Sequence, residues 1–232
     1  MSKRAWMDET WNPTTGCTKV SPGCKHCYAE LMSERLHAMG QKKYLKVFEP
    51  VFHKDTLEKP YRWAKPREVF VSSMSDLFHE DFSLDDVIKP VFEVMNDLPR
   101  HRFQVLTKRA ERLAALSNHL KWTPNIWVGV SVESEKYVGR IDELRKVPAT
   151  VRFLSLEPLL GALSPLDLSG IHWVLVGGES GSGARPMEKA WVRDIRDQCI
   201  REKVPFVFHQ WGGDQRSSTG RLLDDRAWDE HP

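Results

Sequence analysis

Short apolar runs alternate with segments of helical periodicity along most of the chain. From Val69 onward, each apolar run is rich in β-branched and aromatic residues and ends in polar or charged ones, as buried strands do. The runs lack regular polar alternation, which indicates strands that are covered on both faces. We therefore predict strands over residues 69–73, 103–107, 126–132, 151–156, 171–176 and 204–209, preceded by a short strand within residues 4–12.

Helical segments separate these runs. Residues 27–39 favour a helix that stops at Gly40, and Ser83 can cap a helix whose apolar face runs from Leu84 to Leu98. Pro90 lies inside that pattern and should kink or break it, because proline has no N–H. Residues 41–68 are irregular apart from a short helix at 57–63. The other predicted helices cover residues 110–120 and 135–146, and a last long helix has Trp191, Val192, Ile195 and Cys199 on its inner face.

Strands that alternate with helices predict right-handed βαβ units and a parallel sheet. We therefore expect an α/β protein with about six to seven parallel strands and outer helices. An open or partial (βα) barrel and a flat doubly wound sheet both fit this pattern. No Gly-rich dinucleotide fingerprint follows the first strand. We expect a single domain over residues 1–232, with a cysteine loop at 11–30 and an irregular insertion at about 41–68.

Composition narrows the class of protein. The chain has 34 Lys and Arg against 32 Asp and Glu, and a formal charge of +2 argues neither for nor against a nucleic-acid partner. No apolar run follows the opening Met-Ser-Lys-Arg, and no stretch is long and apolar enough to span a membrane, so we expect a cytoplasmic protein without membrane contact. Three clustered cysteines and one isolated cysteine in such a chain indicate a metal site and not a disulfide framework.

The clustered cysteines are Cys17, Cys24 and Cys27, in the stretch WNPTTGCTKVSPGCKHCYAE at residues 11–30. Glycine and proline between them favour a loop that can curl back on itself. A structural zinc site normally has four protein ligands, whereas a [4Fe–4S] cluster held by three cysteines leaves one iron free for a small molecule. His26 could supply a fourth ligand and close a Cys₃His zinc site. Both interpretations therefore stay open on the residues alone.

Polar and charged residues follow nearly every predicted strand. In parallel (βα) architectures the carboxyl ends of the strands meet at one edge and carry the reactive groups. We therefore predict one ligand site that the cysteine loop shares with these strand ends, and we assign no residue a catalytic role. The predicted ligand-binding residues are Ser73, Ser75, Asp76, Lys108, Ser131, Glu133, Glu157, Gly177, Gly178 and Glu179.

A family resemblance covers nearly the whole chain. Its segments are WNPTTGC, GCKHCYAE, VFVSSMSDLFHED, FQVLTKR, WVGVSVES, FLSLEPLLG, WVLVGGESG, ARPM, FHQWG and GRLLDDRAWDE. The sequence is similar to a phage-associated bacterial family of uncharacterised three-Cys-motif proteins, which resemble radical-SAM enzymes. The resemblance implies a partial (βα) barrel of the radical-SAM type, a [4Fe–4S] cluster, and S-adenosylmethionine (SAM) as cofactor. The loop departs from the usual signature, because six residues separate Cys17 from Cys24 and the aromatic Tyr28 follows Cys27.

The same resemblance implies roles at the strand ends. Residues 73–76 would meet the amino group of SAM, Lys108 its carboxylate, and Ser131 and Glu133 its ribose. The sequence thus predicts a radical-SAM-like iron–sulfur enzyme that reductively cleaves SAM to start radical chemistry on an unknown substrate. The alternative is a zinc-stapled α/β binding module without radical chemistry. Nucleic acid is an open candidate partner through basic patches at Lys42, Lys43 and residues 62–67, and a partner protein is equally open.

Overall fold

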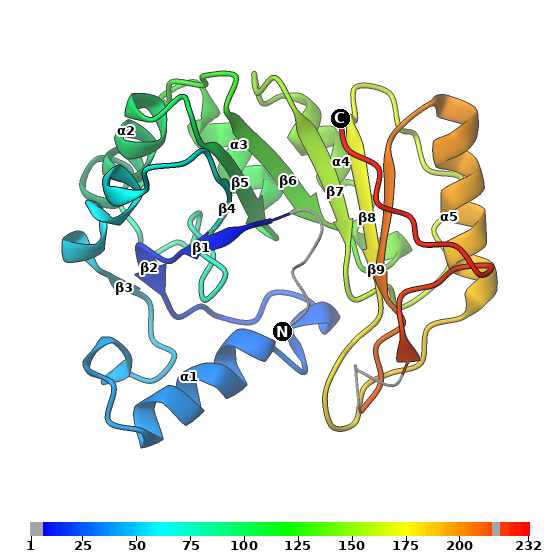
Figure 1. Cartoon of the computed structure of the whole chain (residues 1–232), viewed down its shortest axis with the longest axis horizontal. Helices are drawn as coiled ribbons and strands as arrows, with labels where there is room; N and C mark the ends of the chain where they lie inside the picture. The colour runs from blue at the N-terminus through cyan, green and yellow to red at the C-terminus, as the bar shows by residue number, and fades with distance from the viewer. Residues whose placement is uncertain (1–6, 215–218) are drawn as a thin grey trace.

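The computed structural model describes residues 7–214 and 219–232, and one sheet of seven parallel strands forms its centre (Figure 1). Residues 4–6 of the first predicted strand lie outside the described residues. Six strands coincide with predicted ones to within a few residues, and the seventh is the short first strand. The strands are β1 (Glu9–Trp11), β4 (Glu68–Val71), β5 (Arg102–Thr107), β6 (Ile126–Ser131), β7 (Arg152–Leu156), β8 (Trp173–Gly177) and β9 (Phe206–Gln210).

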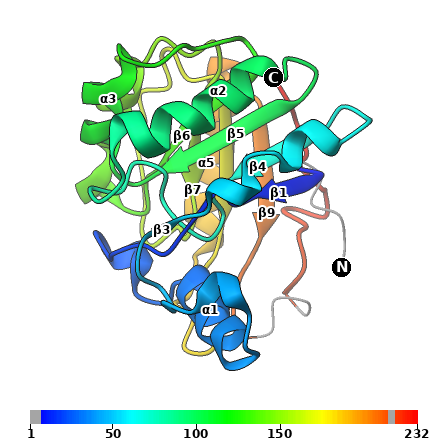
Figure 2. The same ribbon diagram turned by 90° about the vertical axis from the view of Figure 1, so that its left-hand side faces the viewer.

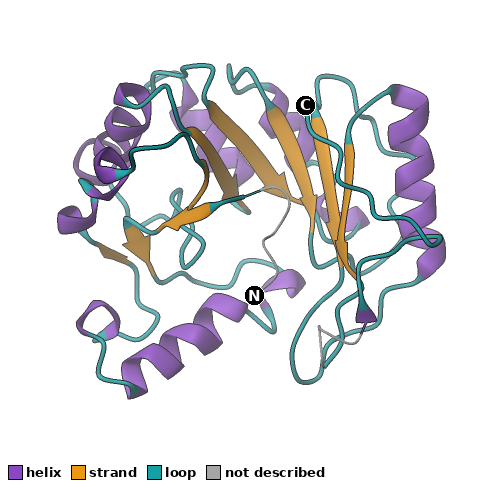
Figure 3. Cartoon of the chain, in the orientation of Figure 1, coloured by secondary structure: helices purple, strands orange, loops and turns teal. Residues whose placement is uncertain are grey.

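The order of the strands distinguishes between the two predicted architectures. The strands of this sheet lie in the order β1-β4-β5-β6-β7-β8-β9. Each one pairs with the strand of the same sheet that follows it along the chain, and every pair is parallel. A doubly wound sheet would reverse this order at a switch point. Because the order never reverses, the right-handed crossovers from β4 onwards place their helices on the same face, and the sheet curls around the other face (Figure 3). The predicted partial (βα) barrel with outer helices is confirmed.

Four helices cover the outer face of the curled sheet, and α1 lies apart from them, below the carboxyl ends of the strands (Figures 1 and 2). The predicted helix 27–39 is confirmed as α1, and Gly40 after it has a positive φ of 71°. The helices are α1 (Tyr28–Ala38), α2 (Lys89–Asp97), α3 (Ala110–Ser117), α4 (Arg140–Arg145) and α5 (Lys189–Glu202).

Proline and glycine divide two of the predicted helices. The Ser83 side chain accepts a hydrogen bond from the Asp86 N–H, as predicted, but the chain then forms a π-helical turn over Leu84–Ile88. Only after this turn does α2 begin, with Pro90 in its first turn, where the missing N–H leaves no bond unmade. Likewise, a 3₁₀ turn over Glu135–Tyr137 precedes Gly139 and α4. The predicted break at Pro90 is confirmed, and the continuous helix predicted for 135–146 is wrong.

The irregular insertion forms a small second layer beside the cysteine loop. Here β2 (Thr14–Thr15) and β3 (Val51–Phe52) pair as antiparallel strands that the apolar pattern did not reveal, because each has only two residues. The short helix predicted at 57–63 is a 3₁₀ turn over Lys59–Arg62. Further 3₁₀ turns cover Pro22–Cys24, Lys42–Tyr44 and Lys54–Thr56.

Apolar side chains fill both sides of the sheet, which explains why the strands lack polar alternation. The larger core lies between the sheet and the outer helices. A smaller core of Trp127, Phe153, Trp173, Leu175 and Val207 lies on the concave side. Burial of both faces stabilises the sheet by about 25 cal/mol for each Å² of apolar surface removed from water.

The carboxyl-terminal segment covers the outer edge of β9. Asp229 bridges Val207 in antiparallel fashion, and the Phe208 N–H donates to the Trp228 carbonyl oxygen at 3.0 Å. The segment thus satisfies backbone groups that an open edge strand would leave exposed. Among the described residues, no helix is both long and apolar enough to cross a membrane.

His53 joins the small second layer to the cysteine loop, and it makes stability depend on pH. Its Nε2 lies 2.7 Å from Thr15 Oγ1. Burial, and then the Lys43 cation, lower the pKa of His53 from its ordinary 6.5 to about 4. Between these two values the unfolded chain binds a proton at His53 that the folded chain does not. The free energy of unfolding should therefore fall as the pH drops from about 6.5 towards 4, and this contribution should be constant above that window.

Replacing His53 with Gln should remove this part of the pH dependence. The measurement is urea unfolding of the wild type and the variant at about pH 7 and about pH 5. Replacing the exposed His119 with Gln is the matched control, and it should leave the dependence as in the wild type. Equal losses of stability in the wild type and the His53 variant over this window would contradict the assignment.

Candidate functional site

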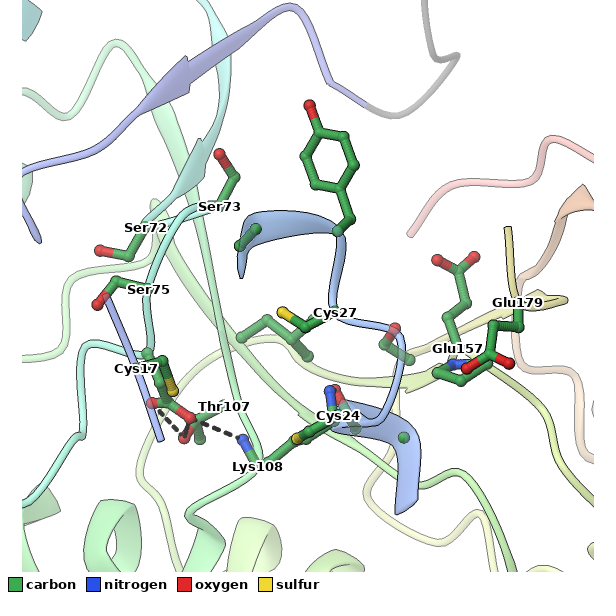
Figure 4. A pocket seen from close by; sticks show the side chains of 18 of the residues that line it. Cys17, Cys24, Cys27, Ser72, Ser73, Ser75, Thr107, Lys108, Glu157 and Glu179 are labelled. Carbon is green, nitrogen blue, oxygen red and sulfur yellow. Dashed lines mark hydrogen bonds between the residues drawn. The ribbon is translucent and has the colours of Figure 1, made fainter. Parts of the chain in front are cut away.

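A cavity of about 360 Å³ opens at the carboxyl ends of the strands, and the cysteine loop forms one of its walls. Its size is that of a small-molecule site. Its floor is apolar, with Phe70, Leu106, Phe153 and Leu175 from the inner face of the sheet. Figure 4 shows the three loop cysteines around one space, with Glu157 and Glu179 on the opposite side.

The structure brings together most of the predicted site residues. Eleven of the thirteen line this cavity, and the two that do not are Glu133 and Gly177. The convergence of strand ends on the cysteine loop is therefore present. The lining members are Cys17, Cys24, Cys27, Ser73, Ser75, Asp76, Lys108, Ser131, Glu157, Gly178 and Glu179.

Arg109, just after β5, holds the first part of the cysteine loop. Its side chain is only 4% exposed. Nη1 donates to the Cys17 sulfur at 3.4 Å, and Nη2 donates to Oγ1 and the carbonyl oxygen of Thr18 at 2.8 and 3.2 Å. Nε donates to both carboxylate oxygens of Glu80, at 3.0 and 2.9 Å. A planar guanidinium bonded in this way has a fixed orientation.

Asp76, at the end of β4, supports this arginine. Its carboxylate accepts from Thr107 Oγ1 at 2.7 and 2.9 Å, from the N–H groups of Phe78 and Lys108, and from Arg109 Nη1 at 3.2 Å. A buried carboxylate is stable when donors surround it in this way. Asp76 lines the cavity, but its oxygens are engaged by the protein itself.

Glu133, just after β6, holds the middle of the loop from beneath. Its side chain is fully buried, accepts a hydrogen bond from the Ser21 hydroxyl, and pairs with Arg140 Nη1 at 2.7 Å. Gly23 packs against the same carboxylate, because a Cβ there would lie 2.6 Å from the Glu133 side chain. The predicted site residue Glu133 therefore lies behind the loop and not in the cavity.

Glu179 and Arg185, after β8, hold the loop from the far side. Arg185 Nε donates to the Glu179 carboxylate at 2.8 Å, and its Nη2 donates to the Pro22 carbonyl oxygen at 2.9 Å. His26 Nδ1 lies 3.3 Å from the carbonyl oxygen of Ser182 on the same segment. The loop is thus tied to groups that follow three different strands.

Two further cavity residues form a pair at the opposite wall. His209 Nδ1 lies 3.0 Å from Glu157 Oε1. Gly177 makes room for this carboxylate, since a Cβ there would lie 2.7 Å from the same oxygen. Gly177 therefore shapes the site without lining it. Nearer the cysteines, Lys108 Nζ donates to the Ser131 hydroxyl at 3.3 Å.

The three loop thiols are chemically suited to an iron–sulfur cluster. They are free, they lie on one loop, and they line one cavity. Among the residues that the structure describes, no three His, Cys, Asp or Glu side chains are placed to share a single metal ion. In a four-iron cluster each cysteine binds its own iron atom, so its sulfurs need not converge on one point. The soft donors and the shared cavity fit a cluster of this kind.

The surroundings of Cys17 disfavour the loss of its thiol proton. Burial, and then the Asp76 carboxylate, raise the pKa of Cys17 to about 11, and Arg109 opposes this shift. The Cys24 sulfur makes a smaller contribution to the same rise. A metal that binds Cys17 must displace its proton, because the thiolate is the ligand.

Sequence reasoning missed the groups that anchor the loop. The residue pattern alone assigns no role to Ser21, Arg109, Arg140 or Arg185. Position offered one signal, since Arg109 directly follows the predicted residue Lys108. The pairings themselves span up to 163 residues of sequence, as between Arg185 and Pro22, and no local pattern encodes them.

Fold and site together define a class: an α/β half-barrel protein with a three-thiol loop at the carboxyl edge of its sheet. The chain belongs to the family described as "Protein of unknown function (DUF5131)", which matches residues 1–232. No curated protein matches the chain.

Structures of spore photoproduct lyase are similar to this chain. The complex with dinucleoside spore photoproduct is 16% identical with a TM-score of 0.47, over 81% of this chain and 59% of that one. A mutant with bound AdoMet and dinucleoside spore photoproduct is 15% identical with a TM-score of 0.49, over 86% of this chain and 65% of that one. The chain thus spans less than two thirds of either protein. At such scores the likeness gives no evidence of shared chemistry.

Gly16 sets the entry to the cysteine loop, and its replacement tests how the loop is held. Its φ is +81°, and a Cβ would lie 2.0 Å from the Glu49 carbonyl oxygen. Gly40 has a similar φ of +71° but nothing within 4 Å of a Cβ. Gly40→Ala should cost about 1 kcal/mol of stability from backbone strain alone, and Gly16→Ala should cost about 3 kcal/mol or more, because the clash adds to the strain.

Urea unfolding of both variants and the wild type measures these costs. Equal losses in the two variants would mean that the backbone at residues 48–49 does not press on the loop.

Proposed function

We propose that this chain is a radical-SAM-like iron–sulfur enzyme that acts on a substrate still to be identified. One observation carries the proposal: three free thiols on one anchored loop line a single cavity at the carboxyl edge of a parallel half-barrel. Parallel (βα) folds place their reactive groups at this edge. The sequence resemblance to three-Cys-motif, radical-SAM-like proteins supports the same conclusion.

Cys17, Cys24 and Cys27 would hold a [4Fe–4S] cluster and leave one iron for SAM. A reduced cluster of this kind supplies the electron that cleaves SAM to methionine and a 5′-deoxyadenosyl radical. The chain's own groups would bind and orient SAM. Lys108 would offer a cation to its carboxylate, and Ser73, Ser75 and Ser131 line the same cavity. The apolar floor can receive the adenine and keep water from it.

We propose a different role for three predicted ligand residues. The oxygens of Asp76, Glu133 and Glu179 are already engaged by arginines and by backbone or hydroxyl donors. These carboxylates would therefore hold the cysteine loop and not the SAM molecule. Glu157 stays a candidate for substrate or cofactor contact, because it lines the cavity together with His209.

Anaerobic reconstitution with iron and sulfide tests the proposal. The wild type should bind about four iron atoms per chain, turn brown, and lose visible absorbance on reduction. With dithionite and SAM it should then form 5′-deoxyadenosine, as measured by liquid chromatography. Cys24→Ser should lose iron and activity. Cys199→Ala is the matched control, because Cys199 is buried on α5 outside the site, and this variant should keep its iron.

A colourless wild type that carries one zinc ion per chain would overturn the proposal and favour the zinc-stapled binding module. In that case His26→Ala should release the zinc, whereas the cluster proposal expects iron to be retained.

Nucleic acid is the substrate class that the charge distribution favours. Residues 17–67, which include the cysteine loop, α1 and the irregular insertion, hold 11 Lys and Arg against five Asp and Glu, although the whole chain is nearly balanced. Tyr28 lines the cavity and is 61% exposed, so it offers an aromatic ring on which a base could stack.

The chain should therefore bind single-stranded DNA or RNA with an affinity that falls as salt rises. Fluorescence anisotropy against salt concentration measures this. Lys42→Gln should reduce the slope of log affinity against log salt by about 1, if it contacts one phosphate. Arg201→Gln on the far helix α5 is the control and should leave the slope unchanged. Binding that is absent, or independent of salt, would contradict a nucleic-acid substrate.

A further inference from the structure

Arg109 donates a hydrogen bond directly to a cysteine sulfur. Its Nη1 lies 3.4 Å from Cys17 Sγ, within hydrogen-bond range for sulfur, and its side chain is 4% exposed. The other anchors of the cysteine loop bind elsewhere: Glu133 binds the Ser21 hydroxyl, and Arg185 binds the Pro22 carbonyl oxygen. Arg109 thus differs from them in what it touches.

The guanidinium cannot swing away from the sulfur without breaking several bonds. Glu80 accepts from its Nε, Asp76 accepts from its Nη1, and Thr18 accepts twice from its Nη2. A guanidinium is too basic to lose its proton in a protein. The group therefore stays a cation beside Cys17 at every working pH.

We propose that Arg109 sets the reduction potential of the cluster that Cys17 would help to bind. This inference rests on the proposed function. Reduction adds negative charge to a cluster, and a hydrogen bond to a ligating sulfur together with a buried cation stabilises that charge. The interaction is strong because water is excluded from the guanidinium. Arg109 thereby makes the cluster easier to reduce, and it acts as a positioning and tuning residue for Cys17.

Asp76 makes the effect larger when Arg109 is removed. Its carboxylate accepts at 3.2 Å from the same Nη1 that donates to the Cys17 sulfur, so its negative charge lies close to that sulfur. Glu80 acts from the outer side of Arg109 and is 59% exposed, so water screens it more. Without Arg109, the buried Asp76 would face the cluster with one cation fewer.

The test compares Arg109→Met with Arg185→Met, after anaerobic reconstitution of both. Both variants lose an arginine that anchors the loop, but only Arg109 touches a sulfur. Redox titration monitored by electron paramagnetic resonance gives the midpoint potential of the clusters that are bound. Arg109→Met should shift this potential to more negative values. Arg185→Met should leave the potential of its bound clusters at the wild-type value, even where it holds fewer of them.

A potential unchanged in Arg109→Met, or shifted equally in both variants, would overturn the inference and leave Arg109 as an anchor only. If Arg109→Met holds no cluster, Glu80→Gln is titrated instead, because it keeps the contact between Arg109 and Cys17. Removing that carboxylate should move the potential to more positive values, and no shift or a negative shift would overturn the inference. A wild type that binds no iron would instead overturn the proposed function itself, so the two failures are distinguishable.

Discussion

Charged groups at the carboxyl ends of the strands, most of them buried, hold the cysteine loop in place, and the rest of the site depends on them. Arg109 follows β5, Glu133 follows β6, and the pair Glu179–Arg185 follows β8. Placing charges in a protein interior is costly unless each one is paired and hydrogen-bonded. Each of these groups is paired, and the loop supplies part of the pairing through its own carbonyls and hydroxyls. The loop is therefore a component of the charge network.

The cavity has two chemically distinct sides. The cysteines, Lys108 and the serine hydroxyls lie towards β4, β5 and β6, while Glu157 and His209 lie towards β7 and β9. The curled sheet makes this division possible, because successive strand ends point at one space from different directions. Soft sulfur donors come from a loop, and oxygen and nitrogen groups come from rigid strands. The cavity therefore presents sulfur donors on one side and a carboxylate–imidazole pair on the other.

The sequence carried enough information to predict most of the sheet. β-branched runs such as those at Val69 and Ile126 are long and continuous, so their strands were recognisable without any partner. The two-residue strands β2 and β3 were not recognisable, since two residues show no period. The sequence signal at Pro90 was recognisable, but the π-helical turn over Leu84–Ile88 before it was not.

For the site, the sequence predicted which residues lie close together, but it did not predict what each side chain binds. Residues at strand ends must meet at one edge, so Ser131, Lys108 and Asp76 were placed near the cysteines by topology alone. Whether a carboxylate faces the cavity or the protein depends on partners that are far away in sequence. Glu133 shows this most clearly, because its partner Ser21 lies 112 residues away. The residues next to Glu133 in the sequence do not show that its carboxylate is already bound by Ser21.

The separation of these partners also has a consequence for biogenesis. The bonds from Arg109, Glu133 and Arg185 to the cysteine loop span 91, 112 and 163 residues, so the loop made early in synthesis meets its last anchor only after β8 has joined the sheet. Contacts of such long range form late in folding. We therefore expect the nascent chain to keep its three loop thiols exposed until the segment that contains Arg185 has been made, so the complete cavity forms only after that point.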